Sequence, residues 1–179
     1  MDWSYPLYCS CRRNADRVAL VGRDGEVTYG ELERRVAAVT AGFEELGLAG
    51  ATVATLSANE PETVELYMAL ARAGATAVPV NTRLTTAEKR FIFEDSGVSA
   101  VVADAEFLAE ARGLRDEVAA VRTVIPVRDS DDGPGLTDLR DSGPGRPAGA
   151  EDGEERAPAT IIYTSGTTGF PKGVVRSHR

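Results

Sequence analysis

TVATLSANEPETVELYMALARAGATAVPV, residues 52–80, is the stretch that decides the fold of this chain. Residues 52–56 and 75–80 are short apolar runs with several β-branched side chains, which predicts two buried strands. Between them, residues 64–73 are apolar on most sides, so we expect a helix that is covered on more than one face. Asn59 is the expected cap of this helix. A strand, a helix and a strand in this order predict a βαβ unit, whose two strands run parallel.

The same alternation continues on both sides of this unit. Further strands are predicted at residues 18–21, 99–103, 123–127 and 160–163, and further helices at residues 28–46, 85–97 and 105–120. Strands that alternate with helices indicate βαβ units. The fold class is therefore α/β, a mostly parallel sheet with helices on both faces. Ligands of such sheets bind outside the carboxyl ends of the strands.

Two of the predicted helices begin with the pattern Thr-x-x-Glu, formed by Thr28 with Glu31 and by Thr85 with Glu88. In such a capping box each side chain bonds the backbone N–H of the other residue, which satisfies donors that the helix leaves free. We therefore interpret these four residues as structural and assign them no role in chemistry.

Composition excludes several classes of function. The chain has 179 residues, enough for one domain with a core, and 42% of them are hydrophobic. Its net charge is −8, so no basic surface for nucleic acid is expected. No apolar run reaches the length of a membrane span. The first residues lack the basic and apolar parts of a signal peptide, which favours a cytoplasmic location.

The roles of the two cysteines and the two lysines are predicted from the residues around them. Cys9 and Cys11 are predicted to be free thiols, since the further ligands that a zinc site needs are absent nearby; a metal site seeded by this pair is the alternative. Lys89 is expected on the surface. Lys172 lies in a loop rich in glycine and hydroxyl side chains, where a cation has a clearer use.

That loop follows the last predicted strand and reads YTSGTTGFPKGV, residues 163–174. Its glycines allow the backbone to approach a ligand closely, and successive N–H groups in such a turn form a concave anion site. The hydroxyl groups add further donors, and Lys172 adds a positive charge that suits phosphate. A loop that merely turns the chain is the alternative. The spacing is not that of a Walker A loop, because Phe170 and Pro171 separate Gly169 from the lysine.

The string resembles the phosphate loop of the adenylate-forming enzymes, which include acyl-CoA synthetases, aryl-acid ligases, luciferases and peptide-synthetase adenylation domains. Two earlier blocks are also similar to that family, VTYGEL at residues 27–32 and LARAGATAVPVN at residues 70–81. The resemblance covers nearly the whole chain. It implies that the fold is the N-terminal part of the large domain of an adenylate-forming enzyme.

Four regions follow from composition and from this resemblance. We expect an irregular lead-in over residues 1–15 and a βαβ-type α/β region over residues 16–127. Residues 128–157 are rich in acidic residues, glycine and proline, which predicts a solvated, flexible connector. A carboxylate-rich cation site is the alternative there, although no EF-hand spacing occurs. Residues 158–179 are expected to hold a strand and a truncated phosphate-binding segment.

The resemblance also implies the roles of the loop residues. The residues that match the family's loop are Thr164, Ser165, Gly166, Thr167, Thr168, Gly169 and Lys172. They are assigned to the β- and γ-phosphates of ATP, with the threonine hydroxyls near Mg²⁺. Full-length relatives activate a carboxylic acid as an acyl-adenylate and pass the acyl group to coenzyme A or to a carrier thiol. No catalytic residue and no protein metal ligand is assigned in this chain.

Several readings of the whole chain remain open. The first is an N-terminal fragment of an acyl-CoA synthetase that is inactive alone, because family members run to several hundred residues. Asn81, Thr82 and Arg83 mildly favour that branch of the family. The second is a nucleotide-binding module, or a half that needs a separate C-terminal partner; the third is a non-functional gene remnant. His178 is expected on the surface, and exposed sheet edges predict self-association.

Overall fold

The structure is a computed structural model that describes residues 5–128, 135–140, 155–164 and 171–179. Its elements in chain order are α1 (Tyr5–Arg13), β1 (Val18–Gly22), β2 (Gly25–Thr28), α2 (Tyr29–Glu45), β3 (Thr52–Leu56), α3 (Pro61–Arg72), β4 (Thr76–Pro79), α4 (Thr86–Ser96), β5 (Ala100–Ala103), η1 (Ala105–Phe107), α5 (Leu108–Glu117), β6 (Thr123–Pro126), α6 (Leu136–Leu139), β7 (Pro158–Thr164) and β8 (Lys172–Ser177).

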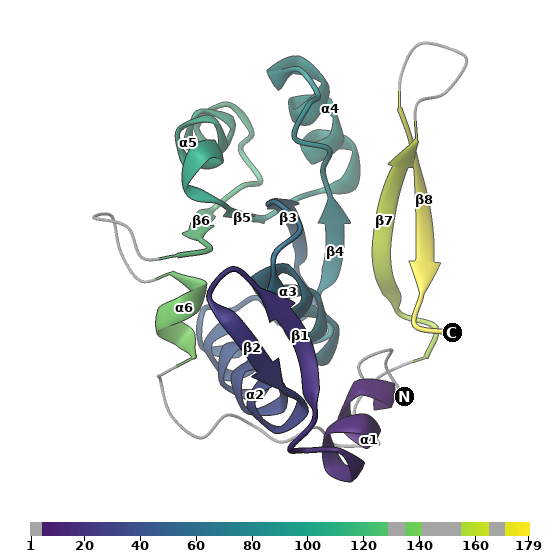
Figure 1. Cartoon of the computed structure of the whole chain (residues 1–179). Helices are drawn as coiled ribbons and strands as arrows, with labels where there is room; N and C mark the ends of the chain where they lie inside the picture. The colour runs from purple at the N-terminus through teal and green to yellow at the C-terminus, as the bar shows by residue number, and fades with distance from the viewer. Residues whose placement is uncertain (1–4, 129–134, 141–154, 165–170) are drawn as a thin grey trace.

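The main sheet has six strands in the order β6-β5-β3-β4-β7-β8 (Figure 1). Strands β3 to β7 run parallel to their neighbours, and only β8 is antiparallel, to β7. Strands β1 and β2 form a separate antiparallel hairpin. The predicted α/β class and its mostly parallel sheet are therefore confirmed. Strands β2 and β8 were not predicted, because β2 has little apolar sequence and β8 begins inside the segment that resembles a loop.

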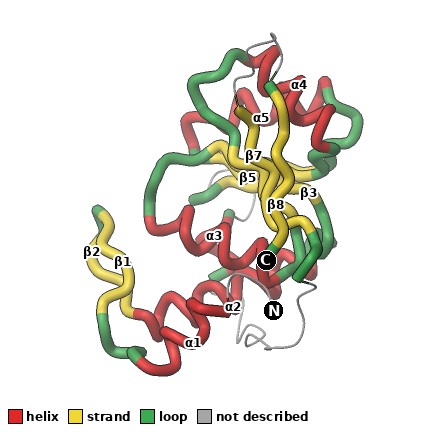
Figure 2. Tube along the Cα trace, turned by 90° about the vertical axis from the view of Figure 1, so that its right-hand side faces the viewer, coloured by secondary structure: helices red, strands yellow, loops and turns green. Residues whose placement is uncertain are grey.

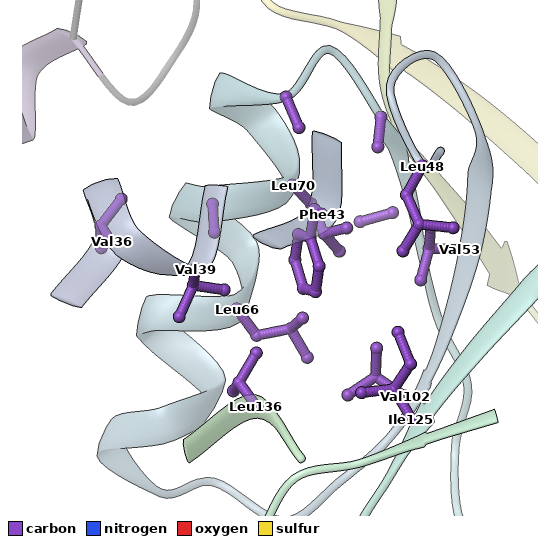
Figure 3. Packing of buried hydrophobic residues seen from close by; sticks show 14 of the residues in the cluster. Val36, Val39, Phe43, Leu48, Val53, Leu66, Leu70, Val102, Ile125 and Leu136 are labelled. Carbon is purple, nitrogen blue, oxygen red and sulfur yellow. The ribbon is translucent and has the colours of Figure 1, made fainter. Parts of the chain in front are cut away.

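Helices cover both faces of this sheet, as predicted. Figure 2 shows α4 and α5 on one side of the strands and α2 and α3 on the other. Successive residues of β3 point into opposite layers, since Val53 belongs to the cluster with α2 and α3, and Ala54 to the cluster with α4 and α5. In the first cluster Phe43 lies close to Leu66 and Leu70 (Figure 3). Both clusters contain side chains with no exposed surface, which is the burial pattern of a parallel sheet.

The helix ends are built largely as the sequence predicts. Thr85 and Glu88 form the expected capping box, and Gly97 ends α4 with φ 67°, a conformation that favours glycine. At α3 the prediction of an Asn59 cap is wrong, since Glu60 holds the cap position and its N–H donates to the Thr63 hydroxyl at 3.5 Å. Pro at the first helical position makes Glu60 the last residue outside the helix.

Two regional predictions need correction. The lead-in predicted to be irregular over residues 1–15 contains the helix α1 (Tyr5–Arg13), whose Cys11 is buried. The predicted connector over residues 128–157 contains α6, and the side chain of Leu136 is fully buried in the first cluster. Composition suggested a solvated segment because glycine, proline and acidic residues surround this single apolar turn. The other acidic residues of the connector lie largely outside the described residues.

Ion pairs reinforce the attachment of α6. Glu65 of α3 has no exposed surface, and its carboxylate accepts from Arg140 Nε at 2.7 Å and from Arg35 Nη1 at 3.2 Å. Burial raises the pKa of this carboxyl, while the two arginines act in the opposite direction. Arg128 similarly donates to Glu62 at 3.1 Å. Arg128 and Arg140, which precede and follow α6 in the chain, thus both bind carboxylates of α3.

Lys89 is a further correction, since it was expected on the surface. Its side chain is 3% exposed, and Nζ lies 2.6 Å from a carboxylate oxygen of Glu110 in α5. The Thr86 hydroxyl donates to the other oxygen of Glu110 at 2.9 Å. A buried ammonium is tolerated where a carboxylate pairs with it, so this pair joins α4 to α5.

Among the described residues, no helix is both long and apolar enough to cross a membrane.

Leu136→Ala tests whether α6 is part of the core. Because the side chain is fully buried, we expect the substitution to lower the free energy of unfolding by about 2–5 kcal/mol. Urea unfolding followed by circular dichroism measures this change. Leu46→Ala is the control, since Leu46 is 50% exposed and its loss should change stability by no more than about 0.5 kcal/mol. Equal stability of the two variants would show that α6 does not contribute to the core.

The edge strand β8 predicts self-association. Val174 and Val175 are more than half exposed and point to opposite faces of the sheet, and an uncovered apolar edge favours pairing with another chain. We expect the 179-residue chain to form dimers or larger species as its concentration rises, and Val175→Lys to suppress them. Size-exclusion chromatography with light scattering measures this. Val21→Lys, on the separate hairpin, should have a smaller effect; a wild-type chain that stays monomeric would contradict the prediction.

Candidate functional site

The described ends of the glycine-rich loop are paired with each other. Thr164 is the last residue of β7, Lys172 is the first residue of β8, and the two are directly opposite in the antiparallel register. Both side chains are exposed. The remaining candidates, Ser165, Gly166, Thr167, Thr168 and Gly169, lie outside the described residues. The structure thus makes Thr164 and Lys172 direct neighbours across the two strands, at the base of the loop.

The sheet places this pair at a position where ligands bind in α/β folds. Because β7 runs parallel to β4, the chain enters the loop from the carboxyl end of β7, which lies at the same edge as the carboxyl ends of the other parallel strands (Figure 1). At the opposite end of β7, the Thr76 hydroxyl donates to the Pro158 carbonyl at 3.2 Å. One end of the hairpin is thus attached to β4, and its other end carries Thr164 and Lys172.

Tyr163, the residue before Thr164, is bonded to the body of the molecule. Its hydroxyl donates to Asp95 Oδ2 at 2.5 Å. Burial and this hydrogen bond raise the pKa of Tyr163 to about 12, so the phenol keeps its proton at neutral pH. The side chains of Ile161 and Tyr163 also pack against the cluster beneath α4 and α5. Sequence reasoning treated Tyr163 as part of a strand and did not predict the contact with α4.

The block at residues 27–32 has a structural role. The Thr28 hydroxyl accepts from the Glu31 N–H at 3.2 Å, as predicted for a cap. The Glu31 carboxylate instead accepts from Arg34 Nε at 2.9 Å and from Arg35 Nε at 2.7 Å, so it does not complete the predicted box. Hydrogen bonds from Arg34 and Arg35 lower the pKa of Glu31 to about 2. This block starts α2, whereas Thr164 and Lys172 belong to β7 and β8.

The block at residues 70–81 builds the sheet. It contains the end of α3 and all of β4, and Ala77 of β4 is the register partner of Thr160 in β7. The block therefore provides β4, the strand with which β7 of the hairpin pairs. In the part of the chain that the structure describes, no group of three or more His, Cys, Asp or Glu side chains could hold a metal ion.

A cavity of about 450 Å³ lies near the other end of the hairpin. Tyr67, Pro79, Ile162 and His178 are among the residues that line it. His178 was expected on the surface and is instead half-buried, with its backbone N–H donating to the Ala157 carbonyl at 3.3 Å. Its lining reaches along β7 to Ile162, which is two residues before Thr164 and shares a face of the strand with it.

Comparisons with known proteins agree with this description. Residues 8–179 match the family model described as AMP-binding enzyme. A 3-hydroxybenzoate–CoA ligase of Aromatoleum sp. (strain CIB) is 37% identical over 168 residues, which is 92% of this chain and 32% of the relative. The long-chain-fatty-acid–CoA ligase FadD13 of Mycobacterium tuberculosis is 35% identical over 157 residues, 87% of this chain and 30% of the relative. The chain spans about a third of the length of these curated relatives.

Solved structures show the same architecture. The N-terminal domain of FACL13 from Mycobacterium tuberculosis superposes with a TM-score of 0.86 at 31% identity, covering 99% of this chain and 44% of that one. The anthranilate CoA ligase AuaEII, solved with anthranoyl-AMP, gives a TM-score of 0.90 at 23% identity, covering 99% of this chain and 35% of that one. The second match supports the fold alone.

Glu31→Gln tests the structural reading of the first block through its pH dependence. The folded pKa of about 2 lies below the ordinary value of 4.5, so the ionised carboxylate stabilises the fold above pH 4.5. We expect the variant to be less stable than wild type at pH 7, by less than about 1 kcal/mol because the side chain is 34% exposed. This difference should shrink as pH falls from 4.5 towards 2.

Urea unfolding at several pH values measures this difference. Glu45→Gln is the matched control, since this side chain is exposed in the last turn of the same helix and should show a smaller difference. A deficit in Glu31→Gln that stays constant down to pH 2 would contradict the assigned ion pairs.

Proposed function

Because this chain belongs to the AMP-binding enzyme family, we propose that its β7–β8 hairpin grips the phosphates of ATP for an acyl-CoA ligase. The observation that carries the proposal is the pairing of Thr164 with Lys172 at the carboxyl end of β7. The loop between them contains the hydroxyls, glycines and N–H groups that suit an anion. The similarity to CoA ligases supports the assignment.

The chemistry requires stabilisation of negative charge. When a carboxylate attacks the α-phosphorus of ATP, pyrophosphate leaves, and its charge must be balanced by positioned donors and cations. Lys172 supplies a cation at the end of the loop, and Thr164 supplies a hydroxyl across from it. We assign Ser165, Gly166, Thr167, Thr168 and Gly169 to the same phosphates. The thiol of coenzyme A then attacks the acyl carbon of the adenylate, a thioester forms, and AMP leaves.

Mg²⁺ fits this arrangement as a metal that arrives with the nucleotide. The described residues offer no carboxylate cluster for it, whereas Mg²⁺ is commonly held by substrate phosphates, waters and one or two protein oxygens. The Thr164 hydroxyl, exposed beside Lys172, is the described group that would contact it. Bound there, the ion would neutralise phosphate charge.

The 179-residue chain is proposed to bind ATP without completing the reaction. It spans about a third of its curated relatives, and groups outside it would supply the acid pocket and the remaining contacts. The substrate of the whole protein is proposed to be a carboxylic acid. Acid-dependent exchange between ATP and pyrophosphate is the assay, with benzoate derivatives and fatty acids as probes. Clear turnover by this chain alone would overturn the binding-only part of the proposal.

Lys172→Ala tests the phosphate role of the loop. A charge-assisted hydrogen bond contributes about 1.5–3 kcal/mol, so we expect the dissociation constant for Mg·ATP to rise at least about tenfold. Isothermal titration calorimetry measures it. Lys172→Arg should retain part of the affinity, since it keeps the positive charge. Arg90→Ala removes an exposed cation on α4, paired with Glu117, and should leave binding unchanged. Equal affinities of Lys172→Ala and wild type would overturn the assignment.

A further inference from the structure

The half of β7 that leads into the loop has no register partner in β4. The register of β7 with β4 consists of Ala77 opposite Thr160, near the start of β7. Strand β4 then ends at Pro79, which has no backbone N–H to donate. Beyond Thr160, β7 continues to Thr164 paired with β8 alone. The two ends of the loop therefore depend on side chains to hold them in place against the body of the molecule.

Tyr163 provides such a contact. Its hydroxyl donates to Asp95 Oδ2 at 2.5 Å, and Asp95 lies in the last turn of α4. Helix α4 is itself fixed, because Ile92 and Phe93 are buried in the second cluster. The hydrogen bond thus joins the end of β7 to a rigid part of the fold, immediately before Thr164.

Gly173 leaves the space that the ring of Tyr163 occupies. It is the register partner of Tyr163 in β8 and directly follows Lys172. A Cβ atom at Gly173 would lie 3.0 Å from Tyr163 Cζ, 3.2 Å from its hydroxyl oxygen and 3.0 Å from Ile161 Cγ2. These distances are tighter than ordinary contacts, so a side chain here would displace the ring. The glycine is needed for space, since its φ does not lie in the left-handed region.

We propose that Asp95, Tyr163 and Gly173 form a clamp that fixes the base of the phosphate loop. Tyr163 precedes Thr164 and is the register partner of Gly173, which follows Lys172, so its contact with Asp95 lies beside both ends of the loop. These three are positioning residues, because they act on phosphate through Thr164 and Lys172. The inference rests on the proposed function for its ligand, and on the described contacts for its geometry.

The clamp lowers the cost of ligand binding. When Thr164 and Lys172 are already held in place, less conformational freedom is lost on binding phosphate, and preorganisation of this kind raises affinity without adding a contact. Without the clamp, the same ordering would have to occur during binding. A bond that only stabilises the fold would lower the unfolding midpoint and leave affinity unchanged, so the two roles are separable.

The test compares Mg·ATP affinity by calorimetry with stability by urea unfolding. Tyr163→Phe removes only the hydroxyl, Asp95→Ala removes the acceptor, and Asp95→Asn keeps an amide oxygen that can accept. Gly173→Ala displaces the ring. The matched control is Tyr67→Phe, which removes a hydroxyl bonded to Thr55 at 3.0 Å, away from the loop.

We expect Tyr163→Phe, Asp95→Ala and Gly173→Ala to weaken Mg·ATP binding about tenfold, which corresponds to about 1.4 kcal/mol. Asp95→Asn should recover part of the affinity lost in Asp95→Ala. Tyr67→Phe should bind within about twofold of wild type even where it is less stable. Wild-type affinity in Tyr163→Phe and Asp95→Ala would overturn the clamp.

Hydrogen exchange separates failure of the clamp from failure of the proposed function. In the absence of ligand, amides of residues 160–164 and 172–176 should exchange faster in Tyr163→Phe and Asp95→Ala than in wild type. In Tyr67→Phe their exchange rates should equal those of wild type. If wild type does not bind Mg·ATP, the phosphate role is wrong and these exchange rates alone decide the clamp. Unchanged exchange in both clamp variants would overturn it.

Discussion

Burial of strand β3 on both of its faces is the constraint on which the rest of the structure depends. Val53 points into the layer with α2 and α3, and Ala54 points into the layer with α4 and α5, both without exposed surface. A parallel strand buried in this way needs a neighbour on each side and a helix over each face. Strands β4 and β5 supply the neighbours, and each crossover helix covers the face that its connection reaches.

This constraint also determines where the loop lies. Once β4 is placed beside β3, β7 adds to the free side of β4, and parallel pairing directs its carboxyl end to the edge where the other parallel strands end. The hairpin turn then pairs Thr164 with Lys172. The position of Thr164 and Lys172 thus depends on the sheet and on the contact of Tyr163 with Asp95.

Buried charge connects the parts that the sheet does not join. Lys89 pairs with Glu110 between α4 and α5, and Glu65 binds Arg35 and Arg140 across α2, α3 and α6. None of these pairs was predicted. A lysine or a glutamate carries no local sign of burial, because the partner that makes burial tolerable lies 21 to 75 residues away.

The sequence by itself determined the alternation of strands and helices, most helix boundaries and the resemblance of the loop to a phosphate site. These features depend on local periodicity, capping chemistry and turn residues, which operate over a few neighbouring positions. Only the tertiary structure decided that α6 belongs to the core, that Gly173 makes room for Tyr163, and that Asp95 holds that tyrosine. Such contacts join residues distant in sequence, so they exist only after the sheet has fixed the elements in space.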